Sequence, residues 1–217
     1  MKIMLDIGHY KCDSGAVYNG VKEVDLNVDI AKYCEEELKR HKVETKVSYG
    51  TLDNRVNMEK AYKPDYFVSI HNNAGKGAGA EVFILAKGGK AEKLASSVYE
   101  YIVNVDKLNN GRGIKTANYY VLKNTNAPAI LIECAFIDSN NYKCIDTLEE
   151  RKAMGVSIAK GILKHIGVKY VPKETNETLY RVCVGSFKEK NNALKLSEEL
   201  KKKGYNSFII TEKKNAN

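Results

Sequence analysis

The chain has 217 residues, of which 43% are hydrophobic, and carries a formal net charge of +8. This length accommodates one medium-sized domain with its own core and a small additional unit, and the apolar content excludes a disordered chain. No run approaches the ~20 apolar residues that span a bilayer, so we expect no membrane partner. Five cysteines without a C-x-x-C pair argue against a disulfide framework and against a thiolate metal site.

The first two thirds of the chain alternate short apolar strands with amphipathic helices. We predict strands at 2–7, 43–49, 66–70, 80–85, 119–122 and 129–132, and helices at 22–41, 52–63, 91–107 and 148–166. Such alternation is typical of an α/β domain with a mainly parallel, twisted sheet flanked by helices. We expect this domain to cover residues 1–167.

Three of these strands lead into a residue that can bind or assist a metal ion. The residues are His9, His71 and Glu133, and because buried parallel strands end at one edge of a sheet, we expect them to converge. Glu23, in the first turn of the next helix, is expected to point toward the same place. Two imidazoles and one carboxylate are a recurrent ligand set for catalytic zinc, and a further carboxylate can accept a proton from water. Each residue alone also has an ordinary structural explanation, so a zinc hydrolase is one candidate.

The remainder of the chain has a different pattern. The periodicity lapses over residues 168–178, which read as a short polar linker. It restarts over residues 179–217, where two strands, at 179–187 and 205–211, flank a helix at 191–203. We therefore predict a small C-terminal β-α-β unit.

The positive charge is unevenly distributed, with +3 on residues 1–167 and +5 on residues 168–217. A basic surface attracts polyanions such as teichoic acids, nucleic acid or anionic lipid. Grooves that bind nucleic acid usually interleave aromatic residues with Lys and Arg, whereas the run Lys201–Lys203 has only Tyr205 nearby. We expect no nucleic-acid partner.

Seven short motifs follow one another across residues 2 to about 165. They are LDIGH at 5–9, DSGA at 13–16, VKEVDLN at 21–27, VSIHNNA at 68–74, GRGIK at 111–115, YVLK at 120–123 and APAILIE at 127–133. Together, in this order, they strongly resemble the zinc-dependent N-acetylmuramoyl-L-alanine amidases. The resemblance implies a hydrolase that cleaves the amide between N-acetylmuramic acid and L-alanine in bacterial peptidoglycan.

The resemblance also implies roles for individual residues. His9, Glu23 and His71 fall on the Zn²⁺ ligands of the family, and Glu133 falls on its catalytic carboxylate. Asn72 and Arg112 could contact substrate, but structural roles in a turn explain them equally well, so we assign no substrate-binding residue. The alternative is a non-catalytic cell-wall-binding protein on the same fold.

The C-terminal unit has a resemblance of its own. Tyr180–Phe187, followed by Ala193, Leu196, Leu200 and the sequence KGY at 203–205, resembles half of a sporulation-related repeat, or SPOR domain, a module that binds glycan strands stripped of peptide. An isolated half exposes one side of a two-stranded sheet. We hypothesise that two chains pair their halves to form a homodimer. The alternative is a remnant that packs on the catalytic domain or stays mobile.

The N-terminus reaches Asp6 before the apolar core of a signal peptide could form. We therefore expect cytoplasmic synthesis without a signal peptide, followed by action on the cell wall after release. The resemblance offers two routes, phage lysis and lysis of a spore-forming mother cell.

Overall fold

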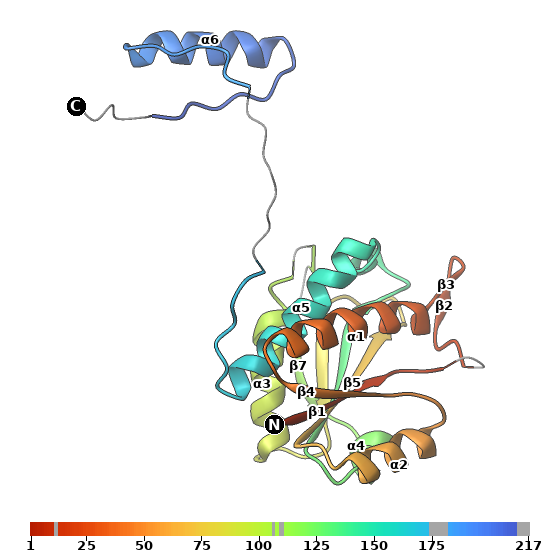
Figure 1. Cartoon of the computed structure of the whole chain (residues 1–217). Helices are drawn as coiled ribbons and strands as arrows, with labels where there is room; N and C mark the ends of the chain where they lie inside the picture. Colours follow the sequence, from red (N-terminus) through yellow and green to blue (C-terminus); the bar gives the residue numbers. More distant parts are fainter. Residues whose placement is uncertain (11–12, 106, 109–110, 174–181, 212–217) are drawn as a thin grey trace. The chain divides into compact units, whose positions relative to one another are not determined.

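The computed structural model describes the chain except for residues 11–12, 106, 109–110, 174–181 and 212–217 (Figure 1). The chain divides into two compact units, Met1–Pro172 and Lys173–Asn217. None of the described helices has both the length and the apolar character that are needed to cross a membrane.

The first unit contains a mixed, mainly parallel sheet. Its strands are β1 (Lys2–Ile7), β4 (Glu44–Ser48), β5 (Tyr66–Asn73), β6 (Ala80–Ile84), β7 (Gly111–Thr116) and β8 (Ala129–Phe136), in the order β4-β1-β5-β8-β6-β7. The first four strands in this order are parallel to one another. Strand β6 is antiparallel to β8, and β7 is parallel to β6. The predicted α/β class with a mainly parallel sheet is confirmed.

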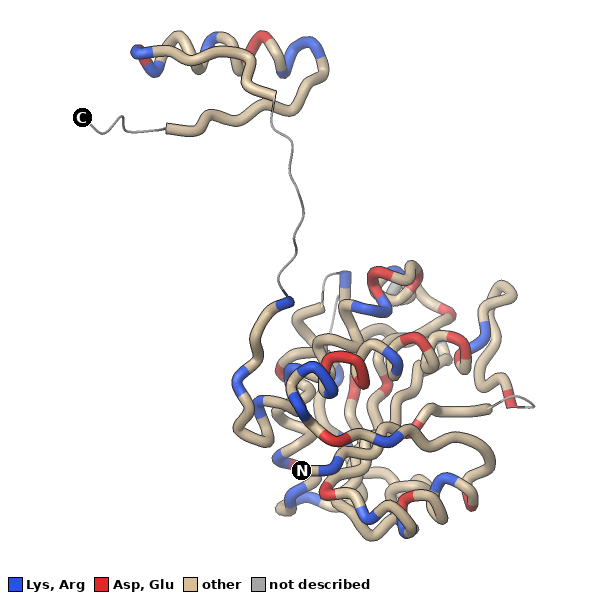
Figure 2. The backbone as a smooth tube through the Cα atoms, in the orientation of Figure 1, with Lys and Arg blue, Asp and Glu red and all other residues tan. Residues whose placement is uncertain are grey.

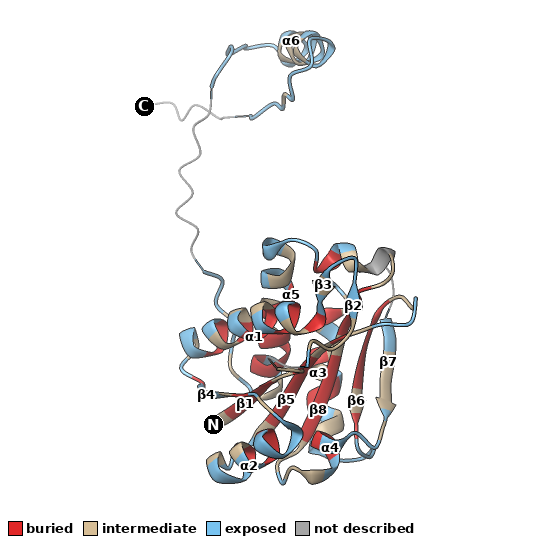
Figure 3. Cartoon of the chain, turned by 90° about the vertical axis from the view of Figure 1, so that its right-hand side faces the viewer, coloured by how far each residue is buried: buried red, intermediate tan, exposed pale blue. Residues whose placement is uncertain are grey.

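Helices cover both faces of this sheet (Figures 1 and 3). The helices α1 (Glu23–Arg40), α3 (Lys90–Ile102) and α5 (Leu148–His165) cover one face, and α2 (Leu52–Tyr62) and α4 (Tyr120–Asn124) cover the other. The central strands are buried on both sides, as their continuous apolar runs predict (Figure 3). A two-stranded hairpin of β2 (Val17–Tyr18) and β3 (Val21–Lys22) leads into α1, and a 3-10 helix, η1 (Asn140–Cys144), precedes α5.

The structure differs from the sequence prediction at several elements of this unit. The helix expected at 91–107 ends at Ile102. The segment 119–122, expected to be a strand, lies mostly in helix α4, and its Val121 and Leu122 are buried beside Phe67. The edge strand β7 was not predicted. In addition, β5 and β8 extend further than expected, so that His71 and Glu133 lie inside these strands and not after them.

The second unit contains one regular element in its described part, the helix α6 (Lys190–Lys202). Lys residues recur along this helix (Figure 2). No strand is formed by the described residues 182–187 or 205–211, so the β-α-β arrangement expected there is not present in them. Residues 179–181 of the expected first strand lie outside the described part. A two-stranded sheet without a covering layer gains little by forming, which accounts for the absence of strands in the described segments.

Candidate metal centre

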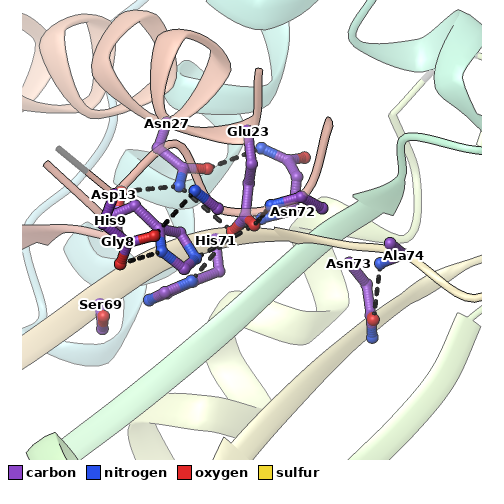
Figure 4. Close-up of polar contacts among 12 residues, drawn as sticks. Gly8, His9, Asp13, Glu23, Asn27, Ser69, His71, Asn72, Asn73 and Ala74 are labelled. Carbon is purple, nitrogen blue, oxygen red and sulfur yellow. Dashed lines mark hydrogen bonds and ion pairs between the residues drawn. The ribbon is translucent and has the colours of Figure 1, made fainter. Parts of the chain in front are cut away.

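Three side chains from separate elements meet at the carboxyl edge of the sheet (Figure 4). His9 lies just after β1, His71 lies in β5, and Glu23 is the first residue of α1. One candidate ligand atom from each residue lies within 4.8 Å of the other two. The two imidazole rings meet edge to face, with their centroids 5.0 Å apart. The three predicted metal ligands are therefore close enough together to hold one ion.

Glu23 lies between the two histidines. Its Oε2 is 3.1 Å from Nε2 of His9, and its Oε1 is 3.0 Å from Nδ1 of His71. Backbone N–H groups also donate to this carboxylate, from Ala16 at 3.0 Å and from Asn72 at 3.1 Å. The residue is 4% exposed. A carboxylate at this helix N-terminus is further favoured by the helix dipole.

The charge states of these side chains follow from their contacts. Burial raises the pKa of Glu23, but its hydrogen bonds with His71 and His9 outweigh burial and hold the pKa well below its usual range. The hydrogen bond that His9 donates to Glu23, assisted by Asp13, raises the pKa of His9 to about 9. Glu23 is therefore negative beside a positively charged His9, and a divalent cation can replace the proton of His9.

A second set of residues orients the first. Asp13 Oδ2 is 2.7 Å from Nδ1 of His9, so Nε2 of that ring faces Glu23. Asn27, one turn after Glu23 on α1, donates to the carbonyl of Gly8 at 3.0 Å and accepts from the amide of Asn72 at 2.8 Å. Such outer contacts fix ring orientation in metal sites.

Two glycines allow the three candidate ligands to approach one another. A Cβ atom on Gly8 would lie 2.4–2.5 Å from three ring atoms of His71. A Cβ atom on Gly15 would lie 2.5 Å from both Glu23 Oε2 and His9 Cδ2, and Gly15 has a φ of +64°. Side chains at these positions would occupy the space of the ligands.

Glu133 approaches the same site from β8. It is the ladder partner of His71 on one side and of Glu81 on the other. Its Oε2 atom is buried and has no hydrogen-bond partner among the described residues. Burial, followed by the negative charges of Glu23 and Glu81, raises its pKa well above the usual value. A carboxyl group of this kind suits proton transfer near neutral pH.

Glu81 is itself held by cations. It accepts hydrogen bonds from Asn73 at 2.8 Å, from Arg112 Nε at 2.8 Å and from Lys115 Nζ. The Arg112 guanidinium also lies over the Phe136 ring, 5.2 Å from its centroid. Arg112 therefore has a structural partner, as does Asn72, although Oδ1 of Asn72 is buried without a hydrogen bond among the described residues.

Sequence reasoning predicted the four central residues but missed Asp13, Asn27 and Glu81. Two of these had a readable signal, because Asp13 lies four residues after His9 and Asn27 lies one helical turn after Glu23. Glu81 had none, since its neighbours on β7 belong to a strand that the sequence does not indicate.

The N-acetylmuramoyl-L-alanine amidase family matches residues 3–164 of the chain. The chain belongs to this family. The amidase is 31% identical over 220 residues to N-acetylmuramoyl-L-alanine amidase CwlM of Bacillus licheniformis, with 97% of this chain and 85% of the relative covered. It is 30% identical over 219 residues to the sporulation-specific N-acetylmuramoyl-L-alanine amidase of Bacillus subtilis (strain 168), with 97% and 84% covered.

Solved structures agree with this assignment. The N-acetylmuramoyl-L-alanine amidase from Clostridium difficile 630 matches with a TM-score of 0.71 and 32% identity over 77% of this chain and 97% of that one. The SPOR domain family matches residues 158–211. The predicted family and enzyme class are confirmed: the amidase is a cell-wall hydrolase that cleaves the bond between N-acetylmuramic acid and L-alanine in peptidoglycan.

Proposed function

We propose that the amidase is a Zn²⁺ enzyme in which His9, Glu23 and His71 hold the metal and Glu133 is the catalytic carboxylate. The observation that carries this proposal is the set of three ligand atoms within 4.8 Å of one another, next to a buried Glu133 oxygen without a partner among the described residues. Two imidazoles and a carboxylate are a donor set that zinc accepts in catalytic sites, where a fourth position stays open.

When bound, zinc would polarise the scissile carbonyl and lower the pKa of a water molecule toward neutrality. Glu133 accepts the proton of the attacking water and delivers it to the nitrogen of the departing L-alanine. Proton delivery is needed because an amine expelled without a proton is a very poor leaving group. The raised pKa of Glu133 allows it to hold that proton between the two steps.

Two variants separate metal binding from proton transfer. We expect Glu133→Gln to keep its zinc and to lose hydrolysis of purified peptidoglycan by at least about 100-fold, the typical contribution of a general acid or base. We expect His71→Ala to lose zinc as well as activity. Glu36→Gln, an exposed change on α1, is the matched control. Near-normal turnover by Glu133→Gln would contradict its assigned role.

We propose that the amidase is made in the cytoplasm and meets the wall only after release. Names among its relatives support this: one is the sporulation-specific amidase of B. subtilis, and another is an endolysin of Bacillus phage SPP1, 35% identical over 153 residues. Fractionation of cells harvested before and after natural lysis tests the proposal. In cells harvested before lysis, the amidase activity should be in the cytoplasmic fraction. Activity on the outside of intact cells would contradict it.

We also propose that two chains associate through their C-terminal units. The described part of this unit has no core of its own, because no residue of α6 is buried and Val182, Tyr205 and Phe208 are 87%, 65% and 74% exposed. Apolar surface of this kind favours association. Light scattering at about 50 µM should give the mass of a dimer for the full chain and of a monomer after truncation at Pro172. A monomeric full chain would contradict the proposal.

A further inference from the structure

An open hollow of about 560 Å³ lies next to the metal centre along the same edge of the sheet. Tyr10, which follows the ligand His9, lines it together with Tyr49 and Gly50, which follow β4. Strand β4 is the parallel neighbour of β1, so the carboxyl ends of both strands meet at this edge. Lys46, Asn54, Asn57, Met58 and Ala61 complete the lining. The hollow therefore begins one residue after His9, at the edge of the sheet where the candidate metal ligands meet.

Two tyrosines give the hollow an aromatic wall. The rings of Tyr10 and Tyr49 stack with their centroids 5.1 Å apart and their planes 28° apart. Tyr49 is 46% exposed, so part of its surface faces solvent. An aromatic ring offers a rigid apolar face with a polar hydroxyl at its rim, which suits the mixed apolar and hydroxylated faces of a sugar ring.

Two amides face solvent beside this wall. Asn54 and Asn57 are exposed, lie one turn apart on α2, and their side-chain amides have no hydrogen-bond partner among the described residues. Each amide offers two donors and one acceptor, the complement of hydroxyl and acetamido groups. Among the described residues that line the hollow, Lys46 is the only one with a charged side chain.

The hollow is tied to the strands that carry the metal ligands. Arg55 Nε donates to the Gly50 carbonyl at 2.9 Å, and its Nη1 lies 3.6 Å from Oδ2 of the buried Asp6 on β1. Asp6 also accepts from Ser48 of β4 at 2.9 Å and from Ser69 of β5 at 2.7 Å. This network fixes the loop that carries Tyr49 relative to β1, which leads into His9, and to β5, which contains His71.

We propose that this hollow is a saccharide subsite that holds a sugar of the glycan strand next to the N-acetylmuramoyl group whose amide is cleaved. The inference rests on the amidase function and deepens it. A glycan fits better than the stem peptide, because stem peptides carry several carboxylates and the described lining of the hollow has a single cation, Lys46. The cations Arg112 and Lys115 lie on β7, at the opposite end of the strand order, and both are paired with Glu81.

Two substrates of different glycan length test this subsite in the full-length zinc-loaded protein. One is a tetrasaccharide that bears a single stem peptide, and the other is N-acetylmuramoyl peptide with no further sugar. The measured quantity is the ratio of kcat/KM for the first substrate to that for the second. Taking this ratio cancels any effect of a variant on the metal, on the chemistry or on overall folding.

We expect Tyr49→Ala and Asn57→Ala each to lower this ratio about tenfold, mainly through KM of the tetrasaccharide. Tyr49→Phe keeps the ring and should restore most of the ratio. Tyr101→Ala, which removes a partly exposed ring on α3, is the matched control and should leave the ratio unchanged.

Several results would overturn the subsite. In one, the wild-type ratio equals one; in another, Tyr49→Ala and Asn57→Ala leave the wild-type ratio unchanged. A larger loss on the N-acetylmuramoyl peptide than on the tetrasaccharide would assign the hollow to the stem peptide instead. A failure of the amidase function would look different, because the wild-type protein would then release no peptide from either substrate. That result would contradict both the amidase function and the subsite.

Discussion

His71 and Glu133 are direct partners in the parallel ladder between β5 and β8. Paired residues in a ladder point their side chains to the same face of the sheet, so the register itself places a proposed metal ligand beside the proposed proton carrier. The other two ligands depend on less regular backbone, because His9 has a φ of +64° after β1 and Glu23 begins α1. Substitutions near His9 and Glu23 should therefore affect metal binding more than substitutions near His71.

Asp13→Ala should weaken zinc binding by ~10–100-fold, as removal of outer contacts to ligating histidines does. Without the 2.7 Å contact at Nδ1, the ring of His9 loses the partner that directs Nε2 toward Glu23. Competition with a chromogenic chelator measures the affinity. Asp25→Ala, an exposed acidic change on α1, is the control. Equal affinities for the two variants would contradict this role of Asp13.

Gly8→Ala should destabilise the fold by about 1–3 kcal/mol and displace His71, because the added methyl overlaps that ring. We expect the purified variant to contain little zinc. Gly89→Ala adds the same methyl where no atom lies within 4 Å, so its zinc content should equal that of the wild type. Metal analysis by mass spectrometry compares the two variants, and a full zinc complement in Gly8→Ala would show that the site is not as closely packed as described.

Glu81→Gln should lower stability in a pH-dependent manner. Burial raises the pKa of Glu81, but hydrogen bonds from Lys115 and Arg112 outweigh it and hold the pKa below its ordinary 4.5. A carboxyl group with a lowered pKa in the folded state stabilises the protein above its unfolded pKa and loses that contribution as the pH falls through the folded value. The side chain is 3% exposed, so we expect a cost of about 2 kcal/mol at pH 7.

Urea unfolding measures the free energy of unfolding between pH 7 and pH 3. The protein is first treated with a chelator, so that release of metal does not contribute to the pH dependence. The difference between wild type and Glu81→Gln should shrink below about pH 4.5, the ordinary value. Glu36→Gln, at an exposed position, should show no such trend. A difference that stays constant with pH would mean that the ion pairs of Glu81 add nothing to stability.

Truncation after Pro172 should leave a folded, active enzyme, because this position separates the two compact units. We expect wild-type turnover of a small muropeptide and weaker retention on sedimented cell walls, since the region that matches the SPOR domain is mostly removed. A pull-down with purified walls measures retention. Unchanged retention would show that the C-terminal unit does not contribute to wall binding.

Patterns that reflect burial were readable from the sequence, and patterns that reflect tertiary contacts were not. The runs that form β1, β5 and β8 are continuous and apolar because both faces are covered, and the residues at their ends led directly to the site. Strand β7 has the sequence GRGIKT, with two glycines and two cations, because it is an edge strand whose side chains are exposed or half-buried. Nothing in its composition indicates a strand.

The segment at 119–122 was predicted as a strand because of its composition, but it lies mostly in helix α4. Two tyrosines followed by Val121 and Leu122 have high strand propensity, but the segment packs one helical turn against Met4 and Phe67, and this packing overrides propensity. In the C-terminal unit, the alternation over 179–187 predicted a strand, yet Val182 and Val184 are exposed in the structure. Alternation specifies a strand only where another layer covers its apolar face.

The central claim is that His9, Glu23 and His71 bind one zinc ion. Anomalous diffraction from zinc-loaded crystals, with data on both sides of the zinc absorption edge, tests it most directly. We predict a single strong peak in the unit Met1–Pro172, about 2.0–2.2 Å from one atom of each of these three residues. A peak elsewhere, or no zinc peak from a protein that hydrolyses peptidoglycan, would contradict the account.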